Sequence, residues 1–372
     1  MLPGQITEVR YALGYLLTVL GNGTLQATPF DASARHVTGP PATIAEGVSV
    51  SASGVAQFAV SRNGTIAYLA VEPQSLVFAD RAGHQRVALA ERHNYHGPRF
   101  SPNGRRVAVD LTGQDGRDVW TVDVGSDRLS RATFDHDGHD VAWTPDGTSI
   151  TYLSARSGTE SIYRKHPGDA ALVSPLFTSA QLGFTGVWTR DSSALVTAVN
   201  DVKTNSGADI GIIRNGGRGP LVPVVATEFT EAFPAPSPDG RWLAYSSDQS
   251  GRPEIYLRAL DGSGDPVQLS LEGGTESVWS SDGHHVFYKS IGNQEPAMVD
   301  AEVVGGATIT VQSRHTLFSM ADIVGANPHA NFDLSSDGST FVFVRSNPPT
   351  RITVIQNLPA LVHNLQTAAP TP

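Results

Sequence analysis

The 372-residue sequence contains no cysteine, and only 17% of its residues are charged. Without cysteine there is no disulfide framework, no cysteine-ligated zinc or iron–sulfur site and no thiol nucleophile. The formal net charge of −10 opposes contact with a phosphate backbone, so nucleic acid is not an expected partner. No run of 18 apolar residues is present, so we expect no membrane insertion.

The most apolar N-terminal stretch is ALGYLLTVL at residues 12–20. It is too short to span a bilayer, has only Arg10 in front of it and is followed by no A-x-A cleavage site. We therefore predict a strand here and find no convincing signal peptide. The C-terminal QTAAPTP (366–372) predicts a disordered tail.

Glycine and proline, by contrast, are abundant, with 37 and 24 copies, as is typical of short strands joined by tight turns. One pattern recurs seven times: an apolar pair, Ser or Thr, any residue, Asp or Asn, Gly or Ser, and then an alternating apolar strand. Successive anchor positions are 40, 43, 45, 48, 43 and 55 residues apart. The anchors are Ser61, Ser101, Thr144, Thr189, Ser237, Ser280 and Ser335.

A repeat of 40–50 residues with Asp-Gly hairpin turns predicts propeller blades. Further strands follow each hairpin at 118–124, 161–166, 209–215 and 254–260. The fold class is therefore all-β: a seven-bladed β-propeller of four-stranded antiparallel blades over residues 1–365. We predict blades near 55–92, 97–134, 140–178, 184–227, 232–271 and 277–318, and a closing blade from 9–50 plus 331–358. If the two ends lie side by side rather than merging, eight blades result.

The phrases SPDGRWLAYSSDQSGRPEIYLRALDG (237–262) and SPNGRRVAVDL…DVWTVD resemble the TolB-like, WD-type bacterial propeller repeat. The order of segments, from GYLLTVLGNGTLQATPFD through SRNGTIAYL to NFDLSSDG, is similar to the C-terminal propeller of bacterial eukaryotic-like Ser/Thr protein kinases. That resemblance implies a sensor or protein-binding module in the periplasm or outside the cell. This sequence has no kinase motif and no G-x-S-x-G, so it predicts neither a kinase nor a serine hydrolase.

Candidate site residues lie just before the anchors, where the chain enters each inner strand at the channel mouth. HNYH (93–96) and HDGH (136–139) repeat one H-x-x-H pair in adjacent blades. Imidazoles and carboxylates converging on one axis suit a divalent metal such as Zn, Mn or Ca in the central channel. The candidate ligands are His96 and His139, then His329, His93 and His136; the candidate catalytic carboxylates are Glu231 and Glu276.

A structural reading stands beside the metal reading, because a repeat that arose by duplication carries its histidines with it. His93 and His136 are expected at the surface. Trp143, Trp188 and Trp279 share one position before three anchors and are expected to pack between blades rather than to stack on a ligand.

Two functions remain open. The first is a non-catalytic binding or sensor module, a freestanding or truncated kinase-accessory propeller that recognises a protein, peptide or glycan at one rim. The alternative is a metal-dependent hydrolase of an ester, lactone or phosphotriester, by architectural resemblance to paraoxonase-type propellers. A monomer is expected, since a closed ring leaves few open sheet edges.

Overall fold

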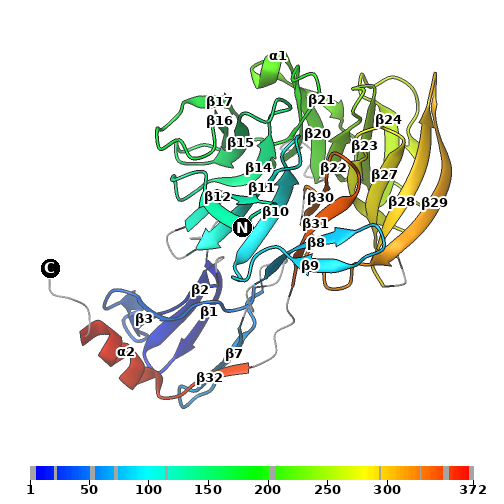
Figure 1. The fold of residues 1–372 in the computed structure, drawn as a ribbon. Coiled ribbons are helices and arrows are strands. Elements are labelled where there is room, and N and C mark those ends of the chain that lie inside the picture. Colours follow the sequence, from blue (N-terminus) through cyan, green and yellow to red (C-terminus); the bar gives the residue numbers. More distant parts are fainter. Residues whose placement is uncertain are drawn as a thin grey trace. The chain divides into compact units, whose positions relative to one another are not determined.

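The computed structural model describes residues 6–20, 23–50, 55–70, 74–113, 116–200, 207–292, 295–326, 328–346 and 352–367. The chain forms two compact units: unit 1 is residues 1–73 with 347–372, and unit 2 is residues 74–346. Strands account for nearly all regular structure in both units (Figure 1). The all-β prediction is confirmed.

Unit 2 contains six four-stranded antiparallel sheets within its described residues, here called blades 1 to 6. Blade 1 is β10 (Asn94–Phe100), β11 (Arg106–Gly113), β12 (Gly116–Asp123) and β13 (Arg128–Arg131). Blade 2 is β14 (His139–Trp143), β15 (Ile150–Ser154), β16 (Ser161–Lys165) and β17 (Pro175–Thr178). Blade 3 is β18 (Val187–Trp188), β19 (Leu195–Asn200), β20 (Ala208–Ile213) and β21 (Leu221–Val225).

The remaining blades follow the same order, except the last. Blade 4 is β22 (Glu231–Pro236), β23 (Trp242–Ser247), β24 (Glu254–Ala259) and β25 (Val267–Gln268). Blade 5 is β26 (Gly274–Trp279), β27 (His285–Ser290), β28 (Ala297–Gly305) and β29 (Ile309–Ser319). Blade 6 joins β30 (Phe332–Leu334) and β31 (Thr340–Arg345) to β8 (Ser75–Asp80) and β9 (Gln85–Val87).

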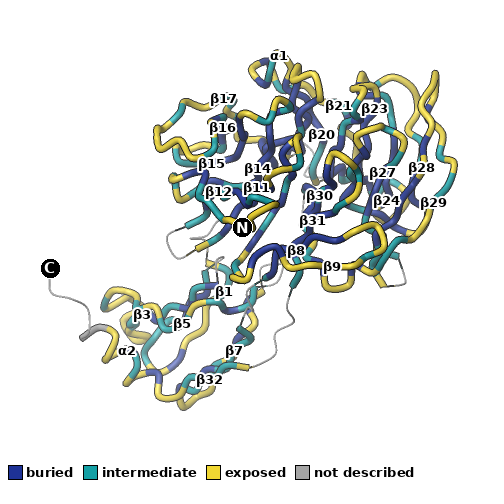
Figure 2. The backbone as a smooth tube through the Cα atoms, viewed as in Figure 1, coloured by how far each residue is buried: buried dark blue, intermediate teal, exposed yellow. Residues whose placement is uncertain are grey.

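The blades close into a ring through their innermost strands. Each of β10, β14, β18, β22, β26 and β30 contacts the next, and β30 contacts β10. An apolar cluster fills each of the six interfaces between neighbouring blades, because a four-stranded sheet cannot bury both its faces alone. Figure 2 shows these strands buried along most of their length and the connecting turns exposed. Unit 2 is a β-propeller.

The recurring Ser or Thr clamps the hairpin after each inner strand. In blade 4 the Ser237 hydroxyl donates to Asp239 and accepts from the Trp242 amide. In blade 2 Thr144 makes the same bonds to Asp146 and Ser149. The anchor pattern is therefore a turn motif rather than a chemical site.

The two ends of the chain pair differently from the prediction. The segment 57–70 supplies β6 (Phe58–Val60) and β7 (Ile66–Leu69). In unit 1, β7 pairs with β6 on one side and with β32 (Ile352–Ile355) on the other. The expected third strand of this segment, β8, pairs instead with β31, and so completes blade 6. Over the described residues the ring therefore has six blades rather than the expected seven, and β8 and β9, not the segment 9–50, pair with β30 and β31 in the closing blade. The local pattern is the same in both arrangements, and only the distant partner strand decides between them.

Unit 1 also contains a five-stranded sheet: β1 (Ile6–Ala12), β2 (Tyr15–Leu20), β3 (Leu25–Asp31), β4 (His36–Val37) and β5 (Ala42–Ala45). The predicted strand at residues 12–20 is present as β2, after a turn at Leu13 and Gly14. Helix α2 (Leu358–Thr367) contacts β5 and buries Leu358 and Val362 in the core of this unit. Residues 366 and 367, expected in the disordered tail, thus lie in a helix, and 368–372 fall outside the described residues.

The other helix is the single turn α1 (Arg214–Gly217) in blade 3. Neither helix has the length and apolar character that crossing a membrane requires, as judged over the described residues.

The clamp at Asp146 predicts a pH-dependent stability. Its hydrogen bond from Thr144 lowers the pKa of Asp146 from its ordinary value of 3.8 to about 2. A lowered folded-state pKa adds stability above pH 4 that is lost as the pH falls towards 2. Asp146→Ala should lower the free energy of unfolding by about 1 kcal/mol at pH 7, and the gap should narrow below pH 4. Urea unfolding at several pH values measures this; a gap that stays constant, or an equal effect of Asp265→Ala at an exposed position, would contradict it.

Candidate functional site

The inner strands of four blades are bulged at one equivalent position. The pairing register breaks between His96 and Arg99, His139 and Ala142, Ala232 and Ala235, and Thr275 and Val278. The bulged residue has a left-handed backbone with φ near 55°: Gly97, Asp140, Phe233 and Glu276. A β-bulge bends its strand and re-aims a side chain. Here each bulge lies where the inner strand lines the channel.

Only one of these four residues is a glycine, so the others hold a backbone conformation that is costly for an L-residue. Hydrogen bonds to a segment distant in the sequence hold this backbone conformation in place. The carboxylate of Asp140 lies 3.1 Å from Nε2 of His329, and Glu276 accepts the Asn331 amide at 2.7 Å. The Phe233 amide donates to the Pro328 carbonyl at 2.7 Å. All three bonds run to residues 328–331, which precede β30.

Residues 328–331, here called the channel segment, are held by the inner strands of the other blades. In blade 1 the Gly97 amide donates to Asn331, and Arg99 donates to the Ala330 carbonyl, both at 2.7 Å. In blade 3 the ring of Phe184 stacks on His329 with centroids 4.7 Å apart. Together with the bonds to blades 2, 4 and 5, the channel segment contacts all five other blades.

His96, Asp140 and His329 form one cluster, whose ligand-type atoms all lie within 4.8 Å of one another. His96 Nδ1 is 3.4 Å from Asp140 and 3.5 Å from Asp110. The guanidinium of Arg117 bridges the two carboxylates and reaches His96 Nδ1 at 2.6 Å. The cluster thus combines two imidazoles, two carboxylates and one resident cation.

Burial and neighbouring charge act in opposite directions on these groups. Burial alone would raise the pKa of Asp140, but His329 and Arg117 hold it well below its ordinary value. Burial also opposes the lowered pKa of Asp110, which Arg117 and His96 produce. Burial lowers the pKa of His96 itself. The cluster therefore holds two ionised carboxylates and a neutral His96 at neutral pH.

The other histidines named from the sequence lie outside this cluster. His139 Nδ1 is 3.0 Å from the Asp137 carbonyl. His93 is partly buried, 3.4 Å from Glu91 and edge-on to Tyr95. His136 is exposed beside Arg131 and Asp118. In blade 2 the bulge turns Asp140, not its neighbour His139, towards His329.

The two candidate catalytic carboxylates are already hydrogen bonded. Glu231 is buried and accepts bonds from Thr227 and Ser247. Glu276 is buried, accepts the Asn331 amide and lies 3.6 Å from Lys289. Burial raises the pKa of both carboxyl groups. Their bonds hold the inner strand and the channel segment in place, which is a structural role.

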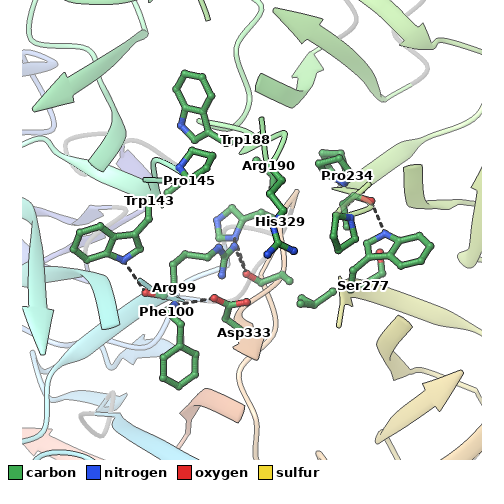
Figure 3. A pocket seen from close by; sticks show the side chains of 18 of the residues that line it. Arg99, Phe100, Trp143, Pro145, Trp188, Arg190, Pro234, Ser277, His329 and Asp333 are labelled. Carbon is green, nitrogen blue, oxygen red and sulfur yellow. Dashed lines mark hydrogen bonds between the residues drawn. The ribbon is translucent and has the colours of Figure 1, made fainter. Parts of the chain in front are cut away.

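A pocket of about 380 Å³ opens where the inner strands end. His329 and Arg190 lie near its centre, between Trp143 and Trp188 on one side and Pro234 and Ser277 on the other (Figure 3). The exposed Arg190, in the blade 3 turn, donates to the Ser281 carbonyl of blade 5 at 3.0 Å and so crosses the mouth. Much of the lining is aromatic or proline: Phe100, Pro102, Trp143, Pro145, Phe184, Trp188, Phe233, Pro234, Pro236, Pro238 and Trp279.

Trp143, Trp188 and Trp279, the three aligned tryptophans, pack between blades and also line this pocket. The indole of Trp143 donates to the Arg99 carbonyl of blade 1 at 3.1 Å, and that of Trp279 to the Ala235 carbonyl of blade 4 at 2.8 Å. Trp188 donates to Thr151 of blade 2. The expected packing between blades is present. All three residues also line the pocket, the role that the sequence pattern favours less.

Sequence reasoning missed Asp110, Arg117 and Arg190. Asp110 and Arg117 lie on the second and third strands of blade 1, whereas the search followed residues before the inner strands. Arg190 lies inside the repeat as an ordinary turn residue, and no signal in the sequence marks its reach across the mouth.

Comparisons with known proteins agree with this architecture. A family model described as the TolB beta propeller domain (PD40) matches residues 47–212. The Tol-Pal system protein TolB of Bordetella pertussis is 33% identical over 126 residues, which cover 32% of this chain and 27% of that protein. The Bordetella parapertussis protein aligns equally well over 26% of its length. The matched stretch thus spans about a quarter of these relatives.

Solved structures share the fold. A putative TolB from Agrobacterium tumefaciens superposes with a TM-score of 0.58 at 18% identity, covering 74% of this chain and 99% of that chain. This chain carries a TolB-like β-propeller. An oligogalacturonate lyase solved with manganese reaches a TM-score of 0.50 at 15% identity, covering 77% and 82% of the two chains. At such identities the TolB-like propeller and these structures share a fold, and an activity does not follow from it.

The close approach of Gly97 to the channel segment makes it sensitive to substitution. A Cβ on Gly97 would lie 3.3 Å from the His329 ring, on a backbone with φ +58°. Gly264 has a similar φ of +70° with no atom within 4 Å of its Cβ position. Gly97→Ala should therefore lower the free energy of unfolding by about 1 kcal/mol more than Gly264→Ala. Denaturant titration of both variants tests this, and equal losses would show that the channel segment does not press on Gly97.

Proposed function

We propose that the propeller is a non-catalytic protein-binding module that takes an extended, apolar segment of a partner into the pocket at the inner-strand ends. The observation that carries the proposal is the pocket itself. Its volume of about 380 Å³ and its lining of indole, phenyl and pyrrolidine rings are typical of a preformed ligand site.

The lining favours a peptide over a polar small molecule. Aromatic grooves bind proline-rich extended segments, which lose little conformational entropy on binding. Indole rings add large rigid contact area. Arg190 at the mouth offers a cation to a carboxylate of the partner, in exchange for its bond to the Ser281 carbonyl.

The pocket offers little for hydrolysis. Among the described residues, the hydrogen-bond partners of His329 are Asp140, Arg99 and the Ala330 carbonyl. No serine of the lining is among these partners. A nucleophile needs a base within hydrogen-bond reach. The resemblance to proteins named for the Tol-Pal system supports a protein partner, in line with the family resemblance of the sequence. A periplasmic location and an origin beside a kinase remain predictions from the family resemblance of the sequence, and a monomeric state remains a prediction from the closed ring.

Blocking the mouth of the pocket tests the proposal. Ser281 is exposed at the mouth, and Ser263 is exposed on an outer turn of blade 4. Peptides selected from a displayed random library on the wild type should bind Ser281→Trp at least about tenfold more weakly, because the new ring fills the cavity. Fluorescence anisotropy measures this, and the matched Ser263→Trp variant should bind as the wild type does. Peptides that bind Ser281→Trp equally well, or a selection that recovers no binding peptide, would refute the proposal.

The second candidate is a metal-dependent hydrolase of esters, lactones or phosphotriesters. The His96, Asp140 and His329 cluster is the observation in its favour, since a bound divalent metal lowers the pKa of water. Glu231 and Glu276, its candidate bases, are hydrogen bonded to Thr227, Ser247 and the Asn331 amide, which favours the binding reading. Turnover of an aryl ester, a lactone or a phosphotriester by metal-supplemented wild type, and its loss in His96→Ala, would favour this reading over binding alone.

A further inference from the structure

The ligand-type atoms of His96, Asp140 and His329, here called the channel cluster, are spaced as ligands around one ion. His329 Nε2 and Asp140 Oδ1 are 3.1 Å apart, and His96 Nδ1 is 3.4 Å from the same Asp140 oxygen. Ligands about 2.1 Å from a zinc ion in a tetrahedron are about 3.4 Å from one another. The existing positions therefore need little adjustment to surround a cation.

A fourth ligand-type atom, an oxygen of Asp110, lies beside these three and has no hydrogen bond among the described residues. Asp110 is fully buried, and its Oδ1 has no hydrogen-bond partner among the described residues. That atom lies 3.5 Å from His96 Nδ1, which is long for a hydrogen bond and close to the spacing of two ligands. A buried carboxylate oxygen without a partner is costly, and a cation would satisfy it.

The surroundings of His329 suit a metal ligand. Its Nδ1 lies 2.9 Å from the Ala330 carbonyl. Arg99 Nη2 also lies 3.3 Å from Nδ1, and Nε2 now faces the Asp140 carboxylate at 3.1 Å. Metal binding would therefore place the proton on Nδ1, where it donates to the Ala330 carbonyl, and give the lone pair of Nε2 to the ion. Ligating histidines usually donate their second ring N–H to a carbonyl or carboxylate in this way.

We propose that His96, Asp140 and His329 form a site for one divalent transition-metal ion, that the neighbouring Asp110 carboxylate moves onto the ion as its fourth ligand, and that the metal competes with the side chain of Arg117 for the site. The guanidinium of Arg117 now contacts three of the four ligands. Its Nε has no hydrogen-bond partner among the described residues, and a quarter of the side chain is exposed. Its movement towards solvent would break its contacts with Asp110, Asp140 and His96, which the metal would replace, but no hydrogen bond at Nε.

Charge and donor type indicate which ion binds. The carboxylates of Asp110 and Asp140 contact the guanidinium of Arg117 directly, while that of Arg99 lies against Nδ1 of His329. A divalent ion that replaced Arg117 would neutralise the two carboxylates. Two imidazole nitrogens with carboxylate oxygens suit Zn²⁺ or Mn²⁺. Ca²⁺ prefers six to eight oxygen ligands, so we expect it to bind more weakly.

Calorimetric titration tests the site with the metal alone. The whole chain, stripped with a chelator and dialysed, is titrated with zinc, manganese and calcium chlorides. We expect one Zn²⁺ or Mn²⁺ per chain. His96→Ala should weaken binding at least about tenfold, whereas His93→Ala, just before the same strand, should not change it. Arg117→Gln should strengthen binding about tenfold, because the competing cation is gone.

Each outcome bears on the proposal. Absence of binding in both the wild type and Arg117→Gln would overturn it, as would binding that survives in folded His96→Ala. Equal affinity of wild type and Arg117→Gln would overturn the competition. Unfolding midpoints of every variant show that the chain is folded, and Arg117→Gln remains informative should His96→Ala fail to fold. Ser281→Trp should bind metal as the wild type does, so failure of the metal site is distinguishable from failure of the peptide pocket.

Discussion

The pairing of β31 with β8 is the interaction on which the rest of unit 2 depends. It runs from Thr340 opposite Asp80 to Arg345 opposite Ser75 and joins the two ends of the ring. The alternating side chains of β31 then serve two interfaces. Phe341 and Phe343 pack against blade 5, and Val342 and Val344 pack against blade 1. One ladder of hydrogen bonds therefore supports two of the six apolar interfaces, and without it both would face water.

Ring closure also places the chemistry. The channel segment lies directly before β30, so its position follows from the sheet that closes the ring. The bulges of the other inner strands then turn a carboxylate or a backbone amide towards it. His329 belongs both to the channel cluster and to the pocket lining. The proposed peptide pocket and the proposed metal site thus share the side chain of His329.

Local signals in the sequence predicted what is locally determined. The Ser or Thr anchors locate the inner strands because the clamp uses residues only two to five positions apart. Counting back from the anchors placed His96 and His329 at the channel, where the structure brings them together. The same counting selected His139, although Asp140 is the residue whose side chain points to the channel. A β-bulge adds one residue to the strand, so every side chain before it points to the opposite face from the one that simple alternation predicts.

What the sequence could not predict depends on distant partners. The hairpin at residues 57–70 carries the same anchor as the true blades, and only pairing with β32, almost 300 residues later, assigns it to unit 1. Arg117 reaches the cluster from the third strand of blade 1, where nothing in its neighbourhood distinguishes it from a surface arginine. The helix over 358–367 was missed because its apolar residues 358 and 362 sit just after a strand pattern.

The nested order of the two units also bears on how the chain is made. Both β7 and β8 are synthesised early, whereas their partners β32 and β31 lie more than 260 residues downstream. At translation rates of about 5–20 residues per second, these strands emerge from the ribosome tens of seconds before they can pair. During that interval each hairpin presents an open edge, the kind of surface that recruits other strands. The nascent chain is therefore most exposed to mispairing until β31 and β32 have been synthesised, a period in which a holding chaperone would protect it.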